Sequence, residues 1–127
     1  MGKRDWREKV AIVTGASEGI GAALTRRLNK LGVRVVMVAR RQEPLAELGR
    51  ALSTETPHLI FPADVSDDSA MTALVETTLT TFGQIDIVVN NAGLHHRGRF
   101  DANATMKLAR MIDVNLRAPL VLMHLAL

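Results

Sequence analysis

Seven residues near the amino terminus have the composition of a loop that binds phosphate: Gly15, Ala16, Ser17, Glu18, Gly19, Ile20 and Gly21. They connect an apolar run, Val10–Thr14, to a segment with helical periodicity. Glycines allow a tight turn and a close approach of the backbone to a ligand, and the start of a helix offers free N–H donors. The stretch is therefore a candidate phosphate site, although a glycine motif taken alone is also compatible with a turn that binds nothing.

Polar residues also follow two later apolar runs. Arg40 and Arg41 come directly after the second run, and the residues 90–93, Asn-Asn-Ala-Gly, come after the fourth. A guanidinium binds phosphate through two N–H donors, whereas the two amides can either contact a ligand or cap a buried turn. The neighbours His95 and His96 have no cysteine and no spaced partner, so we expect no metal site.

These residues would be positioned by short aliphatic and β-branched runs that alternate with longer segments of helical period. The alternation is typical of βαβ units and a parallel sheet. We expect strands at 10–14, 33–39, 58–64 and 85–93, and helices at 22–31, 40–52, 66–82 and 106–127. Pro62 favours an edge position for the third strand, and Pro119 predicts a kink in the last helix. The face of the first helix that we expect to be buried holds Ala23, Leu24, Leu28 and Leu31.

Composition excludes several classes of protein. With 127 residues, 47% of them hydrophobic, the chain is large enough for one domain with a core. Its net charge of +3 lies in short clusters, and three Phe, one Trp and no Tyr offer few stacking surfaces, so we expect no nucleic-acid partner. The charged amino terminus lacks the apolar core of a signal peptide, and Arg117 and His124 interrupt the longest apolar stretch. We therefore expect a cytoplasmic protein with no membrane segment, and the absence of Cys is compatible with that compartment.

Three motifs occur in order: Thr14 with the glycine stretch, Asn90 to Gly93, and Asp113-Val114-Asn115. Together they resemble the short-chain dehydrogenase/reductase family over residues 8–127. The resemblance implies a Rossmann-type, doubly wound α/β fold, of which this chain would hold the first four strands and their helices. Residues 1–127 would then form one NAD(P)-binding domain, truncated before the catalytic segment.

The resemblance also implies roles in binding a nicotinamide dinucleotide. Thr14 would be mainly structural, and Asn90 would tie strands together. Asp64 and Val65 would meet the edge of the adenine. The residues expected to hold the pyrophosphate and nearby ribose are Gly15, Ser17, Gly19, Ile20 and Gly21, and those expected to line the other ribose are Asn91, Ala92 and Gly93.

The type of cofactor depends on charge at the end of the second strand. Enzymes of this kind that use NAD place a carboxylate there for the ribose 2′-OH, whereas a 2′-phosphate requires a cation. This chain has the small Ala39 followed by Arg40 and Arg41, so we expect NADP(H) rather than NAD(H). Glu18 departs from the pattern, because many NADP-dependent relatives have a basic residue at that position near the 2′-phosphate.

In this family hydride moves between the nicotinamide and a carbonyl or alcohol carbon while a Tyr phenol transfers the proton; a Lys lowers the pKa of that phenol, and a Ser holds the substrate oxygen. Asn115 would support the Lys through water, and it is the only matching catalytic position, because the chain contains no Tyr. Our first hypothesis is therefore an NADP(H)-dependent oxidoreductase, here a catalytically incomplete fragment that could at most bind cofactor. Its small carbonyl or alcohol substrate is not specified by these residues.

The alternative hypothesis is a non-catalytic module that binds nucleotide or docks onto a partner. That module would form a discrete oligomer and bind NADPH tightly, whereas a fragment would aggregate or be weakly structured. Because the family commonly pairs subunits through the last helix, a homo-oligomer is compatible with both hypotheses.

Overall fold

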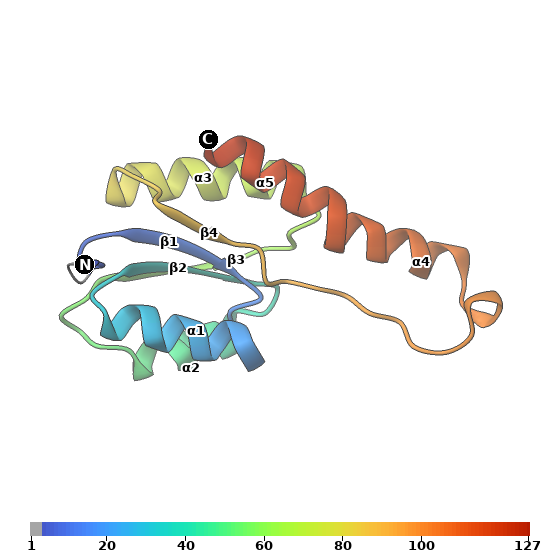
Figure 1. Cartoon of the computed structure of the whole chain (residues 1–127), viewed down its shortest axis with the longest axis horizontal. Helices are drawn as coiled ribbons and strands as arrows, with labels where there is room; N and C mark the ends of the chain where they lie inside the picture. Colours follow the sequence, from blue (N-terminus) through green and yellow to red (C-terminus); the bar gives the residue numbers. More distant parts are fainter. Residues whose placement is uncertain (1–3) are drawn as a thin grey trace.

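A four-stranded parallel sheet in the order β3-β2-β1-β4 forms the centre of the computed structural model, which describes residues 4–127 (Figure 1). The strands are β1 (Val10–Thr14), β2 (Arg34–Ala39), β3 (His58–Pro62) and β4 (Ile87–Val89). The helices are α1 (Gly19–Lys30), α2 (Gln42–Ala51), α3 (Asp68–Phe82), α4 (Thr105–Ile112) and α5 (Ala118–Ala126), with a short 3₁₀ turn, η1 (Phe100–Ala102), and a π-helical turn, η2 (Asp113–Arg117).

The strand order confirms the Rossmann-type, doubly wound arrangement expected from the sequence. β1 pairs with β2 on one side and with β4 on the other, and β3 lies at the edge beyond β2. Pro62 is the last residue of this edge strand and pairs with Ala39 of β2. Because no strand of the sheet lies on the other side of β3, a missing N–H on that side removes no hydrogen bond. The fourth strand is shorter than predicted, because only 87–89 pair with β1 and the residues after Val89 turn away.

Helices cover both faces of the sheet, with α1 and α2 on one face and α3 and α5 on the other (Figure 1). Residues alternate along β1 accordingly: Ala11 and Val13 belong to the core under α1 and α2, whereas Ile12 belongs to the core under α3 and α5. In α1 the prediction is partly wrong. Ala23 is exposed, whereas Ala22 and Thr25 are buried. The helix starts at Gly19, three residues earlier than expected, and its inward face includes the polar residues Thr25 and Asn29.

Local signals at the ends of helices are confirmed. Asp67 caps α3 by accepting a hydrogen bond from the Ala70 amide at 3.1 Å, which satisfies one of the free donors of the first turn. Gly32 follows α1 and Gly83 ends α3, with φ values of +85° and +78° that favour glycine. Local sequence signals therefore predict where α3 begins and where both helices end.

The predicted helix at 106–127 is three segments, α4, η2 and α5, that run on from one another (Figure 1). In η2 the Ala118 amide donates to the carbonyl of Asp113, five residues back. Pro119 lacks the N–H that would bond the carbonyl of Asn115, and its ring crowds that carbonyl, so a widened turn precedes it. The expected kink is thus a π-helical turn, a form that occurs often at functional sites.

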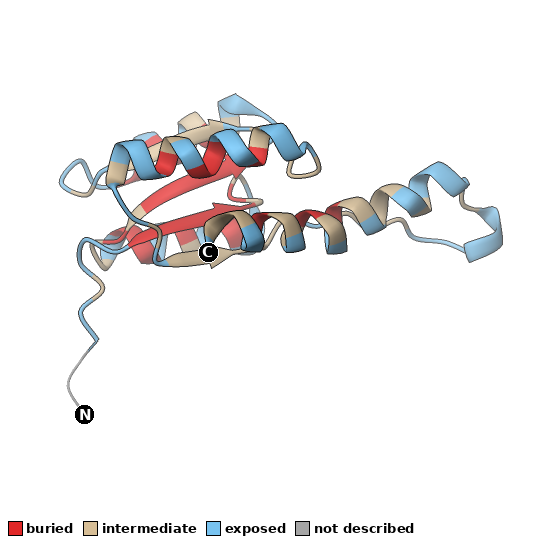
Figure 2. Ribbon diagram, turned by 90° about the horizontal axis from the view of Figure 1, so that it is seen from above, coloured by how far each residue is buried: buried red, intermediate tan, exposed pale blue. Residues whose placement is uncertain are grey.

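Burial differs along this helix (Figure 2). No residue of α4 is buried, whereas Ala118 and Leu122 in α5 are 2% and 1% exposed against the sheet and α3. The outer face carries exposed apolar side chains: Ile112, Leu116, Leu120 and Met123. Within residues 4–127, none of the helices combines the length and apolar character needed to cross a bilayer.

Candidate functional site

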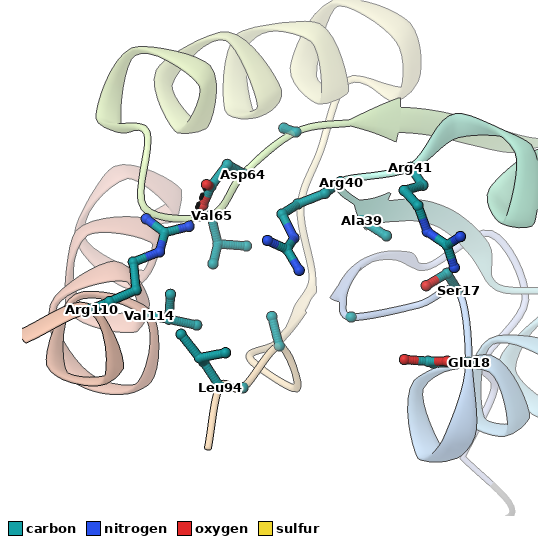
Figure 3. A pocket seen from close by; sticks show the side chains of 14 residues that line it. Ser17, Glu18, Ala39, Arg40, Arg41, Asp64, Val65, Leu94, Arg110 and Val114 are labelled. Atoms are coloured by element: carbon teal, nitrogen blue, oxygen red, sulfur yellow. Dashed lines mark hydrogen bonds and ion pairs between the residues drawn. The ribbon is translucent and has the colours of Figure 1, made fainter. Parts of the chain in front are cut away.

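The carboxyl ends of the strands meet at a cleft of about 530 Å³, a volume within the usual range for small-molecule sites (Figure 3). In open α/β sheets this end of the strands is where ligands bind. The cleft lies at the loops that follow all four strands. It is lined by Gly15, Ser17, Glu18, Ala39, Arg40, Arg41, Ala63, Asp64, Val65, Ala92, Gly93, Leu94, Arg110 and Val114.

The glycine loop is packed so closely that two of its glycines have no room for a side chain. Gly15 has φ +63°, and a Cβ added there would lie 3.0 Å from the Ala92 amide nitrogen. A Cβ at Gly21 would overlap the carbonyl of Gly15 and lie 2.6 Å from Nδ2 of Asn91. The start of α1 is thereby drawn against the end of β1.

At the start of α1, Glu18 makes no side-chain capping bond, so the first N–H groups of the helix stay available. Gly15, Ser17 and Glu18 line the cleft. Gly19, Ile20 and Gly21 lie outside its lining, and Ile20 is 78% exposed. The glycine motif therefore contributes its first residues and the start of α1 to the cleft. Gly21 packs against Gly15, whereas Gly19 and Ile20 are exposed.

Thr14 organises the turn after β4. Its hydroxyl donates to the carbonyl of Val89 at 3.3 Å and accepts from the amides of Asn91 and Ala92, both at 3.0 Å. The Asn91 side chain donates from Nδ2 to the carbonyl of Gly15 at 3.2 Å. These bonds hold Ala92 and Gly93 at the cleft, while Asn91 lies behind them. The structural role expected for Thr14 is confirmed.

Charge in the cleft is divided between two sides. Arg40 and Arg41 are exposed where β2 passes into α2, and Arg40 points toward the middle of the cleft (Figure 3). Arg41 points toward the side that holds Ser17 and Glu18. Within residues 4–127, neither arginine forms an ion pair with Glu18 or with any other carboxylate. Both guanidinium groups are thus available to an anionic ligand.

On the other side, Asp64 is held by three hydrogen bonds. Its Oδ1 accepts from the amide and the hydroxyl of Ser66 at 2.9 and 2.7 Å, and its Oδ2 accepts from Arg110 at 2.5 Å. Partial burial alone would raise the pKa of Asp64, but the bonds from Ser66 and Arg110 outweigh it and lower that pKa from 3.8 to about 2. Asp64 is therefore a fixed carboxylate at neutral pH.

Asn115 lies on η2 and binds the backbone of the loop that leaves the cleft. Its Oδ1 accepts from the Leu94 amide at 2.8 Å, and its Nδ2 donates to the Leu94 carbonyl at 2.7 Å. The amide side chain therefore fastens the residue after Gly93 to the last helix. The role toward a Lys that the resemblance implies stays a prediction.

Besides Ala39, which the sequence indicates only for the space it leaves, four lining residues are not among those expected from the sequence: Ala63, Leu94, Arg110 and Val114. Arg110 lies on a helix 46 residues from its partner Asp64, and no local pattern relates the two. Leu94 and Val114 could have been indicated only by the motifs beside them. Val114 precedes Asn115, and Leu94 follows the motif at 90–93.

The geometry above is that of a Rossmann-type nucleotide site, and comparisons with known proteins agree. The family model described as short chain dehydrogenase matches residues 9–127, so the chain belongs to the short-chain dehydrogenase family. An uncharacterized oxidoreductase of Staphylococcus epidermidis is 38% identical over 114 residues, which cover 90% of this chain and 49% of that protein. The chain thus spans about half the length of the curated relatives it matches.

Solved structures show the same relation. The crystal structure of a metagenomic short-chain oxidoreductase in complex with NADP is 36% identical, with a TM-score of 0.88 over 94% of this chain and 55% of that one. A 3-ketoacyl-(acyl-carrier-protein) reductase from Brucella melitensis, complexed with NADH, is 31% identical, with a TM-score of 0.87 over 93% and 48%. Relatives of this chain therefore bind nicotinamide dinucleotides of both kinds.

Proposed function

We propose that residues 1–127 form the dinucleotide-binding domain of a short-chain oxidoreductase and that this domain takes NADP(H) in preference to NAD(H). The observation that carries the preference is the pair Arg40 and Arg41, both exposed at the cleft and both outside the ion pairs of residues 4–127. The family membership and the ligands of the relatives support the class of ligand, and the charge of the cleft supports the choice between the two cofactors.

The residues present fit a dinucleotide. At Gly15 and Gly21 the backbone makes a turn too close for a Cβ, as the approach of a pyrophosphate requires. The uncapped start of α1 offers N–H donors beside Ser17. Asp64 and Val65 line the side on which we expect the adenine. On the β4 side, Ala92 and Gly93 would line the second ribose, with Asn91 holding their turn, while Gly19 and Ile20 would act through the backbone at the helix start.

Electrostatics favour a 2′-phosphate despite Glu18. Ala39 leaves space beside Arg40 and Arg41, and two guanidinium groups can each give a phosphate a forked pair of N–H donors. Glu18 lies on the same side of the cleft and would repel the phosphate. Two cations against one carboxylate leave a net attraction for the 2′-phosphate.

When bound, the dinucleotide would supply a nicotinamide that gives or takes hydride at a carbonyl or alcohol carbon. This chain's own residues would bind and orient that cofactor, and Asn115 would fix the loop at Leu94 beside it. Because the chain contains no Tyr, we expect no turnover from residues 1–127 alone. The remaining catalytic groups, the substrate and any subunit pairing belong to the proposed whole oxidoreductase.

The test is a parallel titration of the chain with NADPH and NADH by calorimetry. We expect NADPH to bind about tenfold more tightly, and Arg40→Ala or Arg41→Ala to weaken NADPH about tenfold each while changing NADH less than about twofold, as loss of a charge-assisted contact to phosphate predicts. Arg50→Ala is the control, since Arg50 is exposed on α2 and pairs with Glu43. Equal affinities, or tighter NADH, would overturn the preference, and a folded chain that binds neither would overturn the site.

A further inference from the structure

Two arginines on the last helix bind one short segment of the cleft wall. Arg110 donates from Nη2 to Oδ2 of Asp64 and from Nη1 to Oγ of Ser66, both at 2.5 Å. Arg117 donates to the Ser66 carbonyl at 2.8 Å and to Oδ1 of Asp68 at 2.6 Å. Segment 64–68, which joins β3 to α3, is thus bonded to α4 and η2 at four points.

These contacts differ from the arginine pairs that join near neighbours on the surface. Arg99 pairs with Asp101 two residues away, and Arg7 pairs with Asp5 in the same manner, so both link neighbours that are already close. Arg110, in contrast, joins positions 44 and 46 residues apart and is only 36% exposed in its side chain. A guanidinium that donates to two acceptors at once fixes the orientation of both side chains.

The helix that carries Arg110 has few other attachments. No residue of α4 is buried, and the loop before it, 94–104, is almost wholly exposed or partly exposed. The hydrogen bonds of Arg110 to Asp64 and Ser66 are therefore the main attachment of α4 to the body of the fold. Arg110 and Asp64 both line the cleft (Figure 3).

Asp64 keeps a defined capacity for a ligand. A carboxylate has about four acceptor positions, and Ser66 and Arg110 occupy three of them in residues 4–127. One acceptor position remains on Oδ2, whose direction is set by the bond to Arg110. The exocyclic amine of adenine is a donor of matching type, whereas hypoxanthine has a carbonyl in that place.

We propose that Arg110 is a positioning residue for the adenine side of the cleft: it orients Asp64 so that the free acceptor selects an amino-bearing base. This inference rests on the proposed function. It assigns base selection to a residue on α4, far along the chain from the segment that would contact the base. It also joins the binding of the adenine to the helix that carries Asn115.

The experiment compares NADPH with its hypoxanthine analogue, in which a carbonyl replaces the exocyclic amine and N1 carries a hydrogen, on wild type, Arg110→Met, Arg110→Lys and Arg99→Met. We expect wild type to favour NADPH about tenfold, the value of roughly one charge-assisted hydrogen bond. Arg110→Met should bind NADPH about fivefold more weakly and discriminate less than twofold. Arg110→Lys, which keeps the charge and loses the fork, should discriminate to an intermediate degree, and Arg99→Met should match wild type.

Hydrogen exchange of the ligand-free chains gives an independent readout. Amides of 64–68 and of α4 should exchange faster in Arg110→Met, with no change in β1 and β2. Unchanged exchange would overturn the inference, as would discrimination that persists while affinity falls, because a merely structural arginine would weaken both ligands alike. If wild type binds neither ligand, the proposed function fails and this inference with it. If wild type binds NADPH and Arg110→Met matches it, only this inference fails.

Discussion

The hydroxyl of Thr14 is the point at which the fold and the cleft can be tested together. Thr14 is 1% exposed, and Thr14→Val keeps the shape of its side chain while removing a hydroxyl that makes three hydrogen bonds. The Asn91 amide and the Val89 carbonyl also bond each other at 3.0 Å, so both keep a partner in the variant. The Ala92 amide keeps none among the bonds of residues 4–127.

The expected cost follows from this difference. The Ala92 amide, a part-buried donor left without an acceptor, costs about 1 to 2 kcal/mol. Loss of the bonds to the Asn91 amide and the Val89 carbonyl adds about 0.5 kcal/mol each. Thr14→Val should therefore reduce the free energy of unfolding by roughly 2 to 3 kcal/mol. Thr14→Ser keeps the hydroxyl and loses one buried methyl group, which costs about 1 kcal/mol. The order of the two variants is therefore the prediction, with valine the more damaging.

Urea unfolding measures both values, followed by circular dichroism and by the fluorescence of Trp6, the one tryptophan, which packs against the core under α1 and α2. Calorimetry with NADPH should show a weaker complex for Thr14→Val alone, since that variant releases the turn at Ala92. If Thr14→Ser were as unstable as Thr14→Val, packing of the methyl group would explain the role of this residue, and the hydrogen-bond reasoning would be refuted.

Two further predictions concern the glycine loop and the fixed carboxylate. Gly21→Ala should lower the free energy of unfolding by about 3 kcal/mol, because backbone atoms of Gly15 cannot yield, whereas Gly83→Ala meets open space and should cost only about 1 kcal/mol of left-handed strain; equal urea midpoints would contradict this. Because the folded pKa of Asp64 is about 2, below its usual value, the stability it contributes is complete above about pH 4 and is lost as pH falls toward 2. Wild type should therefore lose on the order of 1 kcal/mol more than Asp64→Asn between pH 5 and pH 2.5, after allowance for solvent screening, and parallel urea curves at the two pH values test the difference.

Much of this architecture could be predicted because the signals are local. The apolar run Val10–Thr14 is typical of a buried strand, Asp67 caps α3, and Pro62 indicates an edge strand. The glycine stretch follows β1 as expected, and the residues 90–93 follow β4, although the expected strand 85–93 includes them. The topology of a parallel sheet brings both segments to one side. These features depend on a few neighbouring residues each.

What could not be predicted depends on contacts between distant segments. The pairing of Arg110 with Asp64, and of Asn115 with Leu94, arises only when the last helix lies across the ends of the strands. The inward face of α1 differs from the expectation at Ala23 because polar residues share the buried side: Asn29 bonds the backbone of Ser53 and Thr56, and apolar spacing does not reveal such contacts. The length of β4 is likewise set by its partner β1 and not by its own apolar run.

The π-helical turn at 113–117 keeps the two ends of the last helix in phase. The side chains at 110, 114, 118 and 122 face the cleft or the core at every fourth residue, a spacing that drifts by about 120° over the interval in a regular α-helix. One extra residue in the wide turn takes up about 100° of that drift. Deleting a single residue from η2 would restore a regular helix and swing Arg110 away from Asp64 while Leu122 stayed in the core. The turn thus sets the rotation of α4 relative to α5, so that burial of Leu122 in the core directs Arg110 toward Asp64.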